Sequence, residues 1–537
     1  PSGCAMPLHR RLVTLAAMSA RPNILLITSD QQMLDMLGFK NAALRTPALD
    51  RLAAGGVDLT RTYCPNPTCT PSRASILTGL MPSRHGAYSL GTKLRETVPT
   101  LGDRLRPLGY RSTLVGKAHF QPMADGEEDW QKSVERQPIF RDLDFWRHFN
   151  DRHTPWYGFD HVELTRNHTD EAHVGSHYAL WMQEQGLTDW QRYFQQWPPA
   201  DRRDNRAGYQ GQPATWDLPE EFHYSKWTAD RTIAALEDAG RGDHPFFLWS
   251  SFHDPHPSYL CPKPWAEMYD PVDMPIGTYV PGELDAMPLP HRMTKDKSAD
   301  WSRFQEPGGH ACHGYHYHAY DEDDLRRSMA VYYGMTSLMD HHIGRVLDAL
   351  ESTGQADNTL VVFTSDHGHL LGHHGLVAKG PFHYEPMIRV PMLARWPGRI
   401  EAGTTNRSLH SLVDLAPTFC AAAGLDIDDC SPGAMQGCNQ LEHWQGSEAV
   451  RDAVVVENRH QPSKVHLRTI VTEQYKLTLY RGHAEWGELF DLHADPDERT
   501  NLFDVPSHAG TVAMMMRQLI EQDMQGQPTP MPRVSAA

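Results

Sequence analysis

Short runs of apolar residues alternate with longer amphipathic stretches over most of the chain. Residues 23–29 and 359–365 are almost continuously apolar, as expected of strands that are buried on both faces. Further strands are predicted at 112–115, 245–251 and 387–394. Residues 322–351 carry apolar side chains mostly at three- and four-residue steps, which predicts a long helix. Buried strands alternating with helices predict an α/β fold, in which helices sandwich a large, mostly parallel sheet.

The pattern changes near residue 454. Strand-like pieces at 465–471, 475–480 and 487–492, followed by a closing helix at 509–522, predict a small α+β domain with a short antiparallel sheet. We therefore expect an α/β domain over 21–450 and the smaller domain with its tail over 451–537. Residues 125–212, rich in Trp, Arg and His, are predicted to be an insertion that shapes a cleft. Residues 1–20 are interpreted as an N-terminal extension, with a weak export signal as the alternative.

Both of the most apolar strands end in an aspartate. Asp30 follows the first strand and Asp366 follows the strand at 359–365. Ligands bind at the carboxyl ends of parallel strands, so the two carboxylates are predicted to converge on one site. Taken singly, each aspartate is explained more simply as the cap of the next element.

A cysteine stands at the start of a predicted short helix. Pro71 suits the first turn of this helix and Gly79 suits its C-terminal end. Cys69 would then lie at the positive end of the helix dipole, and Arg73 would add a cation one turn further on. On these grounds alone, a reactive thiol and a small buried side chain are about equally well supported.

Several stretches taken together resemble one protein family. Cys69-Thr70-Pro71-Ser72-Arg73, continuing to Leu77-Thr78-Gly79, resembles the signature of the type I sulfatases of the alkaline phosphatase superfamily. The other stretches that resemble this family follow in the expected order, at 109–119, 252–257, Asp366-His367-Gly368 with Lys379, Lys476-Leu477, 488–492 and 495–502. The resemblance covers nearly the whole chain after residue 20. The pair Asp30-Gln31, together with His367, is similar to the branch near arylsulfatase/phosphonate monoester hydrolase and choline sulfatase.

The resemblance implies a hydrolase that cleaves a sulfate monoester, which could be an aryl, alkyl or sugar sulfate. In this family a formylglycine-generating maturation enzyme oxidises the signature cysteine, and the hydrate of formylglycine supplies the attacking oxygen. The implied catalytic residues are Cys69, Arg73, Lys117, His119, His256 and Lys379. The implied metal ligands are Asp30, Gln31, Cys69, Asp366 and His367. His256 would protonate the leaving oxygen, and His119 would take a proton from the second hydroxyl as sulfate is expelled.

The identity of the metal and of the ester stays open at this point. Calcium is the usual metal of the family, but the imidazole of His367 makes manganese a serious alternative. The same site could serve a phosphonate monoester or a phosphodiester. A non-catalytic protein that binds sulfated glycans is a weaker alternative. The dense histidines of residues 310–318 are interpreted as part of a substrate-contacting loop rather than as a second metal site.

The amino-acid composition limits the classes of molecule that the protein is expected to bind. The 537 residues carry a formal net charge of −17, which disfavours nucleic acid and anionic membranes as partners. An anionic substrate must therefore be attracted by local positive groups. Eight cysteines without framework spacing imply no disulfide scaffold, so we expect a cytoplasmic protein, with the periplasm as the alternative. Relatives with an Asp-Gln pair are commonly dimers or tetramers, which implies a homo-oligomer by analogy.

Overall fold

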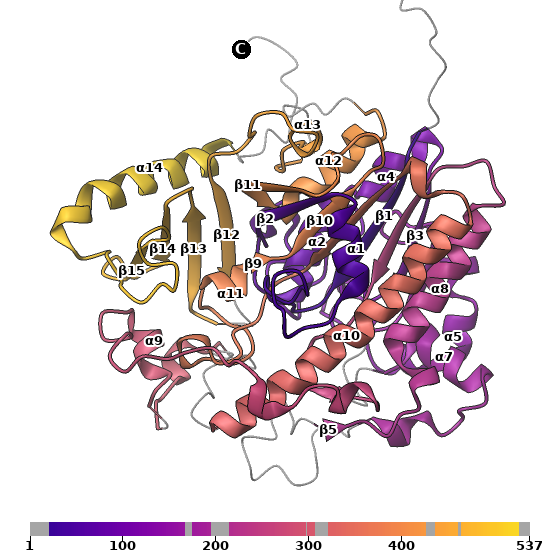
Figure 1. Ribbon diagram of the computed structural model, residues 1–537, viewed down its shortest axis with the longest axis horizontal. Helices are drawn as coiled ribbons and strands as arrows, with labels where there is room; N and C mark the ends of the chain where they lie inside the picture. Colours follow the sequence, from indigo (N-terminus) through magenta and orange to yellow (C-terminus); the bar gives the residue numbers. More distant parts are fainter. Residues whose placement is uncertain are drawn as a thin grey trace, which may run out of the picture.

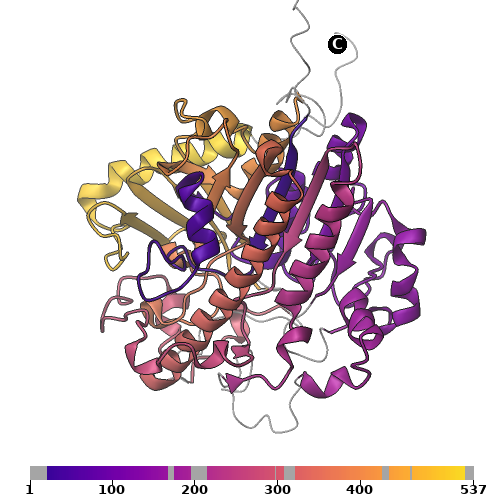
Figure 2. The same cartoon turned by 45° about the vertical axis from the view of Figure 1, so that its right-hand side comes forward.

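A computed structural model describes residues 21–166, 174–194, 214–296, 298–306, 321–425, 435–459 and 463–525. Its centre is a nine-stranded sheet with helices on both faces (Figures 1 and 2). The strand order is β11 (Thr404–Ser411), β2 (Val57–Tyr63), β10 (Met392–Arg395), β8 (Thr359–Ser365), β1 (Asn23–Ser29), β6 (Phe246–Ser251), β3 (Arg111–Gly116) and β4 (His161–Leu164), and β9 (Arg389–Val390) pairs with β2. Only β9 and β10 run antiparallel to their partners, so the predicted mostly parallel sheet is confirmed.

The central strand β1 explains why the sequence pattern is continuously apolar. Alternate side chains of a strand point to opposite faces of the sheet. Ile24 and Leu26 pack into the apolar cluster on one face, whereas Leu25 and Ile27 pack into the cluster on the other, and all four are fully buried. A strand that is covered on both faces needs an apolar residue at nearly every position.

Each face of the sheet has its own set of helices. One face carries α1 (Pro47–Ala54), α8 (Tyr224–Ala239) and α10 (Glu322–Ser352), and the other carries α2 (Cys69–Thr78), α4 (Leu101–Leu105) and α12 (Leu415–Ala422). Figure 2 shows α8 and α10 next to each other across one face. The long helix predicted at 322–351 is confirmed. It begins with a capping box, in which Asp321 accepts a hydrogen bond from the backbone N–H of Asp324.

In the main sheet the prediction was wrong in one strand and missed three others, and outside this sheet it missed the strands at 214–215, 260–261 and 454–459. The strand expected at 387–394 is divided: its first residues belong to α11 (Glu385–Ile388), and Pro391 separates β9 from β10. Proline has no N–H to donate to a neighbouring strand. Strands β2, β4 and β11 were not predicted, because polar residues interrupt the apolar pattern in all three. Most polar residues of β4 and β11, the two edge strands, stay at least partly exposed. Strand β4 lies within residues 125–212, so part of this stretch forms the edge of the main sheet.

The C-terminal region forms a separate sheet. The antiparallel strands are β12 (Val454–Arg459), β13 (His466–Val471), β14 (Tyr475–Tyr480) and β15 (Gly487–Asp491). Helix α14 (Ala509–Gln525) packs on this sheet through Val512, Met515 and Leu519. Figure 1 shows this sheet and α14 beside the β11–β2 side of the main sheet. The predicted short antiparallel sheet is confirmed.

The remaining elements are short. They are α3 (Pro82–His85), α5 (Leu143–Arg147), α6 (Phe149–His153), α7 (Ser176–Glu184), α9 (Leu289–Met293), α13 (Leu441–Trp444), β5 (Ala214–Thr215) and β7 (Leu260–Cys261). Strands β5 and β7 pair in parallel as a two-stranded sheet. Among the helices in the described ranges, none has both the length and the apolar character that a bilayer-spanning segment requires.

Candidate active site

The two strand-terminal aspartates lie side by side at the carboxyl edge of the main sheet. Strands β1 and β8 pair in parallel up to Ser29 and Ser365, and Asp30 and Asp366 are the next residues. Both carboxylates are fully buried. Arg73 lies between them, with Nε 2.8 Å from Asp366 and a terminal guanidinium nitrogen 3.4 Å from Asp30. The sequence-based expectation that the two strands bring their carboxylates to one site agrees with this arrangement.

Four side chains at this edge form a cluster that could hold a metal ion. The ligand atoms of Asp30, Cys69, Asp366 and His367 all lie within 4.8 Å of one another, and all four residues are buried. The Cys69 sulfur lies 3.3 Å from His367 Nε2 and 3.7 Å from an oxygen of Asp30. Carboxylate and imidazole groups this close together suit a divalent cation, which would also offset their negative charge.

Gln31, the predicted fifth contact, lies next to this cluster. Its backbone N–H donates to Asp366 at 3.1 Å, and its carbonyl accepts a hydrogen bond from the Tyr332 hydroxyl at 2.8 Å. Its side-chain amide is fully buried, and neither its oxygen nor its nitrogen has a hydrogen-bond partner among the described residues. A buried amide without partners is costly, so its oxygen is available as a further ligand.

Helix α2 places Cys69 at the site. The helix begins at Cys69 and ends at Thr78, and the following Gly79 has a φ of 70°, the left-handed conformation that favours glycine. The Ser72 hydroxyl donates to the backbone carbonyl of Asp366 at 2.5 Å, which fixes the first turn of the helix against the end of β8. The predicted short helix, with the cysteine at its N-terminus and Gly79 at its end, is confirmed.

Two lysines direct positive charge at the thiol. Lys379 Nζ lies 3.1 Å from the Cys69 sulfur, and Lys117 Nζ lies 3.8 Å from it while also contacting Asp30. Burial and Asp30 raise the pKa of the Cys69 thiol, but Lys117 and Lys379 outweigh them, so the pKa lies below its ordinary value. Burial also acts to raise the pKa of Asp30, but Lys117 and Arg73 hold that pKa well below its usual range.

His256 contacts the same lysine. His256 Nε2 lies 3.2 Å from Lys379 Nζ, and its Nδ1 contacts the carbonyl of Pro257. A carbonyl can only accept, so Nδ1 carries the hydrogen and Nε2 accepts a hydrogen bond from the lysine. Burial, with the neighbouring Lys379, holds the pKa of His256 well below its usual range.

His119 is also buried near these charges, but no hydrogen bond joins it to Cys69 in the described part of the chain. Its φ of 57° is left-handed, and its Nδ1 has no hydrogen-bond partner among the described residues. Burial lowers the pKa of His119 well below its usual range, and Arg166 and Lys117 lower it further. The structure therefore groups nine of the ten predicted site residues through direct contacts or backbone connections, and it places His119 at the margin.

The sequence analysis missed two residues at this site. Ser251, the last residue of β6, accepts a hydrogen bond from Arg73 at 2.7 Å and donates to the carbonyl of Lys117 at 2.7 Å. The sequence feature that could have identified Ser251 is its position as a polar residue at the end of an apolar strand. Arg166 follows β4 and pairs with Glu135 at 2.8 Å, and its positive charge helps to lower the pKa of His119. No local signal marks Arg166, since β4 itself was not predicted. The histidines of residues 310–318 lie outside the described residues.

Comparisons with known proteins agree with this arrangement. The sequence model described as sulfatase matches residues 22–425, and the model described as N-sulphoglucosamine sulphohydrolase, C-terminal, matches residues 372–525. A multifunctional alkaline phosphatase superfamily protein of Trinickia caryophylli is 28% identical over 528 residues, which cover 92% of this chain and 93% of that protein. A choline-sulfatase of Rhizobium meliloti is 27% identical over 495 residues, which cover 91% of this chain and 83% of that protein.

Among solved structures, the phosphonate monoester hydrolase of Agrobacterium radiobacter is similar, with a TM-score of 0.72 and 25% sequence identity. The similarity covers 95% of this chain and 97% of that one, and therefore includes both sheets. The motifs, the fold and the sulfatase match over most of the chain agree. The chain belongs to the sulfatase family, the hydrolases that act on sulfuric esters.

Proposed function

We propose that this protein hydrolyses a sulfate monoester, which is an aryl, alkyl or sugar sulfate. The reaction uses a formylglycine made from Cys69 together with a bound divalent metal ion. The observation that carries the proposal is the setting of Cys69, which lies between a cluster of potential metal ligands and two lysines. Cys64 provides an internal comparison, because burial and Asp366 raise the pKa of its thiol well above the ordinary value. A cysteine that only fills space needs no cations directed at its sulfur.

The side chains present fit a divalent cation. Asp30 and Asp366 offer carboxylate oxygens, His367 offers an imidazole nitrogen, and the amide of Gln31 is buried without a hydrogen-bond partner among the described residues. An ion held there supplies positive charge that stabilises an oxygen nucleophile and the sulfuryl oxygens. Calcium suits the oxygen donors, and the imidazole makes manganese the alternative.

Three cations are proposed to hold the sulfuryl group. Arg73 is fixed by Asp366, by Ser251 and by the carbonyl of Lys117, at distances of 2.7 to 3.0 Å. Its charge is therefore already oriented when the ester binds, and little reorganisation is needed. Lys117 and Lys379 provide two more positive groups within 3.8 Å of the sulfur of residue 69.

Proton transfer to the leaving oxygen is assigned to His256 together with Lys379. Because the pKa of His256 is held low by burial and by Lys379, the imidazole is neutral and the shared proton resides on the lysine. When the anionic ester binds, this proton would pass from Lys379 Nζ to His256 Nε2, and from Nε2 to the leaving oxygen as the sulfur–oxygen bond breaks. His119 keeps its predicted role as the group that accepts a proton from the second hydroxyl of residue 69, and its low pKa supplies the neutral form that this role requires.

Mass analysis of the tryptic peptide of residues 62–73 tests the proposal. This peptide contains both Cys64 and Cys69. We expect alkylation at Cys64 and an aldehyde at residue 69 in active enzyme. Protein produced without a formylglycine-generating enzyme should keep both thiols and hydrolyse no sulfate ester. Fully active protein with an unmodified thiol at residue 69 would rule the mechanism out.

A phosphonate monoester or phosphate diester is the second candidate substrate. Gln31 and His367 favour it, because this combination resembles the phosphonate monoester hydrolase branch, and the similar structure from Agrobacterium radiobacter is such a hydrolase. Lys117 favours the sulfate ester, since this lysine contacts Asp30 in the cluster and belongs to a stretch that resembles sulfatases. Values of kcat/KM on a sulfate ester and a phosphonate ester with the same leaving group decide between them. A large preference for the phosphonate would reverse the ranking.

A further inference from the structure

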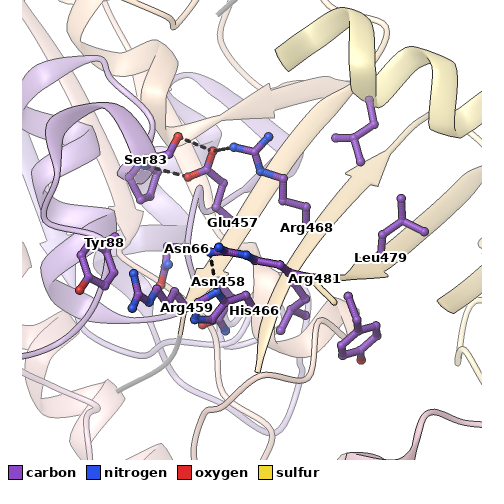
Figure 3. A pocket seen from close by; sticks show the side chains of 14 residues that line it. Asn66, Ser83, Tyr88, Glu457, Asn458, Arg459, His466, Arg468, Leu479 and Arg481 are labelled. Atoms are coloured by element: carbon purple, nitrogen blue, oxygen red, sulfur yellow. Dashed lines mark hydrogen bonds and ion pairs between the residues drawn. The ribbon is translucent and has the colours of Figure 1, made fainter. Parts of the chain in front are cut away.

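A pocket of about 590 Å³ lies between α3 and the C-terminal sheet (Figure 3). Pro82, Ser83 and Tyr88 line one side of it, and residues of β12, β13 and β14 line the other. Its volume falls within the range of pockets that hold small organic ligands. No residue assigned above to catalysis or to the metal lines this pocket, so it is distinct from the cluster around Cys69.

The pocket nevertheless adjoins the active site. Asn66 lines it and precedes Cys69 by three residues, which can span at most about 11 Å. Asn458 also lines it, and its side-chain amide donates to the carbonyl of Gly380, the residue after Lys379, at 3.3 Å. The segment that carries the nucleophile therefore contributes Asn66 to the pocket, and the segment that carries the active-site lysine is hydrogen-bonded to a second lining residue. An extended ligand could occupy both places at once.

Positive charge dominates this pocket, although the chain as a whole carries −17. Arg459, Arg468 and Arg481 line it, against the single lining carboxylate of Glu457. Outside the lining, Glu306 lies 3.4 Å from Arg459 and Asp523 contacts Arg468. The Glu457 carboxylate is already occupied, since it accepts two hydrogen bonds from Ser83 at 2.8 Å and contacts Arg468 at 2.7 Å (Figure 3). Arg481 forms no ion pair with any residue in the described ranges. The pocket is therefore suited to an anion.

Two of the arginines are held in place by neighbouring rings. The carbonyl of Ser463 accepts a hydrogen bond from His466 Nε2 at 2.9 Å, so His466 Nδ1 can accept one from Arg481, 3.4 Å away. The Arg459 guanidinium lies 4.5 Å from the ring centre of Tyr88, and its Nε has no hydrogen-bond partner among the described residues. Preoriented guanidinium groups bind carboxylates and sulfates with little loss of side-chain entropy.

The other lining groups suit a sugar ring. Leu467, Leu479 and Leu519 offer apolar surface to the C–H groups of a ring. The side-chain oxygen of Asn458 is buried and has no hydrogen-bond partner among the described residues, so it can accept from a hydroxyl. Apolar walls with a few convergent polar groups are typical of ligand pockets.

We infer that this pocket is a subsite for a second, anionic unit of a sulfated oligosaccharide whose ester bond is cleaved beside Cys69. The anionic group is a carboxylate or a second sulfate, and Arg459 and Arg481 bind it. The inference rests on the proposed function, because it takes the cluster around Cys69 as the place where the sulfate ester is hydrolysed.

Kinetics on matched disaccharides test the subsite. The members of one set carry the sulfate to be cleaved at the same position of the first unit, which is O2, O3 or O6. They differ only in the second unit, which is a neutral hexose, a hexuronate or a hexose with its own sulfate. We expect kcat/KM for at least one anionic member to exceed that of its neutral counterpart by about tenfold or more. The hexuronate and the disulfated members distinguish a carboxylate from a sulfate. The preference should shrink as salt is added, because the arginines are partly exposed.

Arg481→Gln and Arg459→Gln should each remove most of this preference, mainly through KM. Arg407→Gln is the matched control, since Arg407 is an exposed arginine on β11 that does not line the pocket. Hydrolysis of a simple aryl sulfate is measured on every sample. If the aryl sulfate is hydrolysed but no anionic disaccharide is preferred, or if both variants keep the preference, the subsite is wrong. If no sulfate ester of any kind is hydrolysed, the proposed function itself fails.

Discussion

The cluster around Cys69 and a second cluster around Lys476 both hold full charges away from water, and they are built differently. Lys476, on β14, contacts Glu498 and lies 3.3 Å from Glu385, which begins α11. The hydroxyl of Tyr63, on β2, donates to Glu385 at 3.0 Å. This second cluster therefore ties the C-terminal sheet to the main sheet through opposite charges that face one another.

Around Cys69 the matching is incomplete: Arg73 and Lys117 pair with Asp366 and Asp30, but other polar groups face no opposite charge. Two lysines face a thiol, and the side-chain amide of Gln31 has no hydrogen-bond partner in the described part of the chain. Burying charged and polar groups is costly unless they are paired. The comparison indicates that the Lys476 cluster serves folding, whereas the Cys69 cluster keeps groups available for an ester and an ion.

The largest expected effect comes from Cys69→Ala. Loss of the nucleophile should lower kcat for an aryl sulfate by at least about 10⁴-fold, as for other enzymes that lose a nucleophile. The midpoint of thermal unfolding should change little, because the cluster around Cys69 does not hold the two sheets together. Cys64→Ala removes a buried thiol five residues away and should keep most of the activity. Substantial turnover by Cys69→Ala would contradict the assignment, and wild-type protein that binds sulfated glycans without turnover would support the non-catalytic alternative.

Lys476→Met should lower stability and leave activity nearly unchanged, which is the reverse of the result expected for Cys69→Ala. It leaves Glu385 and Glu498 buried without their cation, so the free energy of unfolding should fall by about 3–5 kcal/mol. Urea denaturation measures this loss, and kcat per folded molecule should stay close to the wild-type value. Adding Glu498→Gln to the variant should restore part of the stability, because one unpaired charge is removed. A large loss of kcat with unchanged stability would contradict the conclusion that the Lys476 cluster serves folding.

The two clusters also differ in how far the sequence predicts them. Asp30 and Asp366 end continuously apolar strands, and Cys69 lies in a local signature, so short stretches suffice to place them at one site. Lys476 was assigned to the C-terminal domain, but nothing near it in the sequence indicates that it reaches Glu385. That contact depends on how two sheets pack, which local periodicity does not encode. The same holds for β2, whose Asp58 and Thr62 become buried only through strands far away in the chain.

Removal of the metal should act on the Cys69 cluster alone. A cation that binds the folded state at one hundred times its Kd stabilises it by about 3 kcal/mol, so a chelator should lower the unfolding midpoint and abolish turnover. Readdition of calcium or manganese identifies the ion that restores both. Asp366→Asn should make stability insensitive to the chelator, whereas Lys476→Met should still respond. A wild-type enzyme that stays active and metal-free after chelation would contradict the assigned ligands.

The smallest expected effect is the pH dependence of the Lys476 cluster. Burial, opposed by Lys476, raises the pKa of Glu498 from 4.5 to about 7. Because the folded state then holds a proton more tightly than the unfolded chain, this stabilisation is complete below about pH 4.5 and is lost as the pH rises through 7. Between pH 6 and 8 the contribution should fall by about 1.4 kcal/mol. The unfolding free energies of the wild type and of Glu498→Gln are measured across this range. Their difference separates the contribution of Glu498 from that of other titrating groups. A difference that stays constant with pH would show that Glu498 is ionised throughout, and that Lys476 compensates both carboxylates.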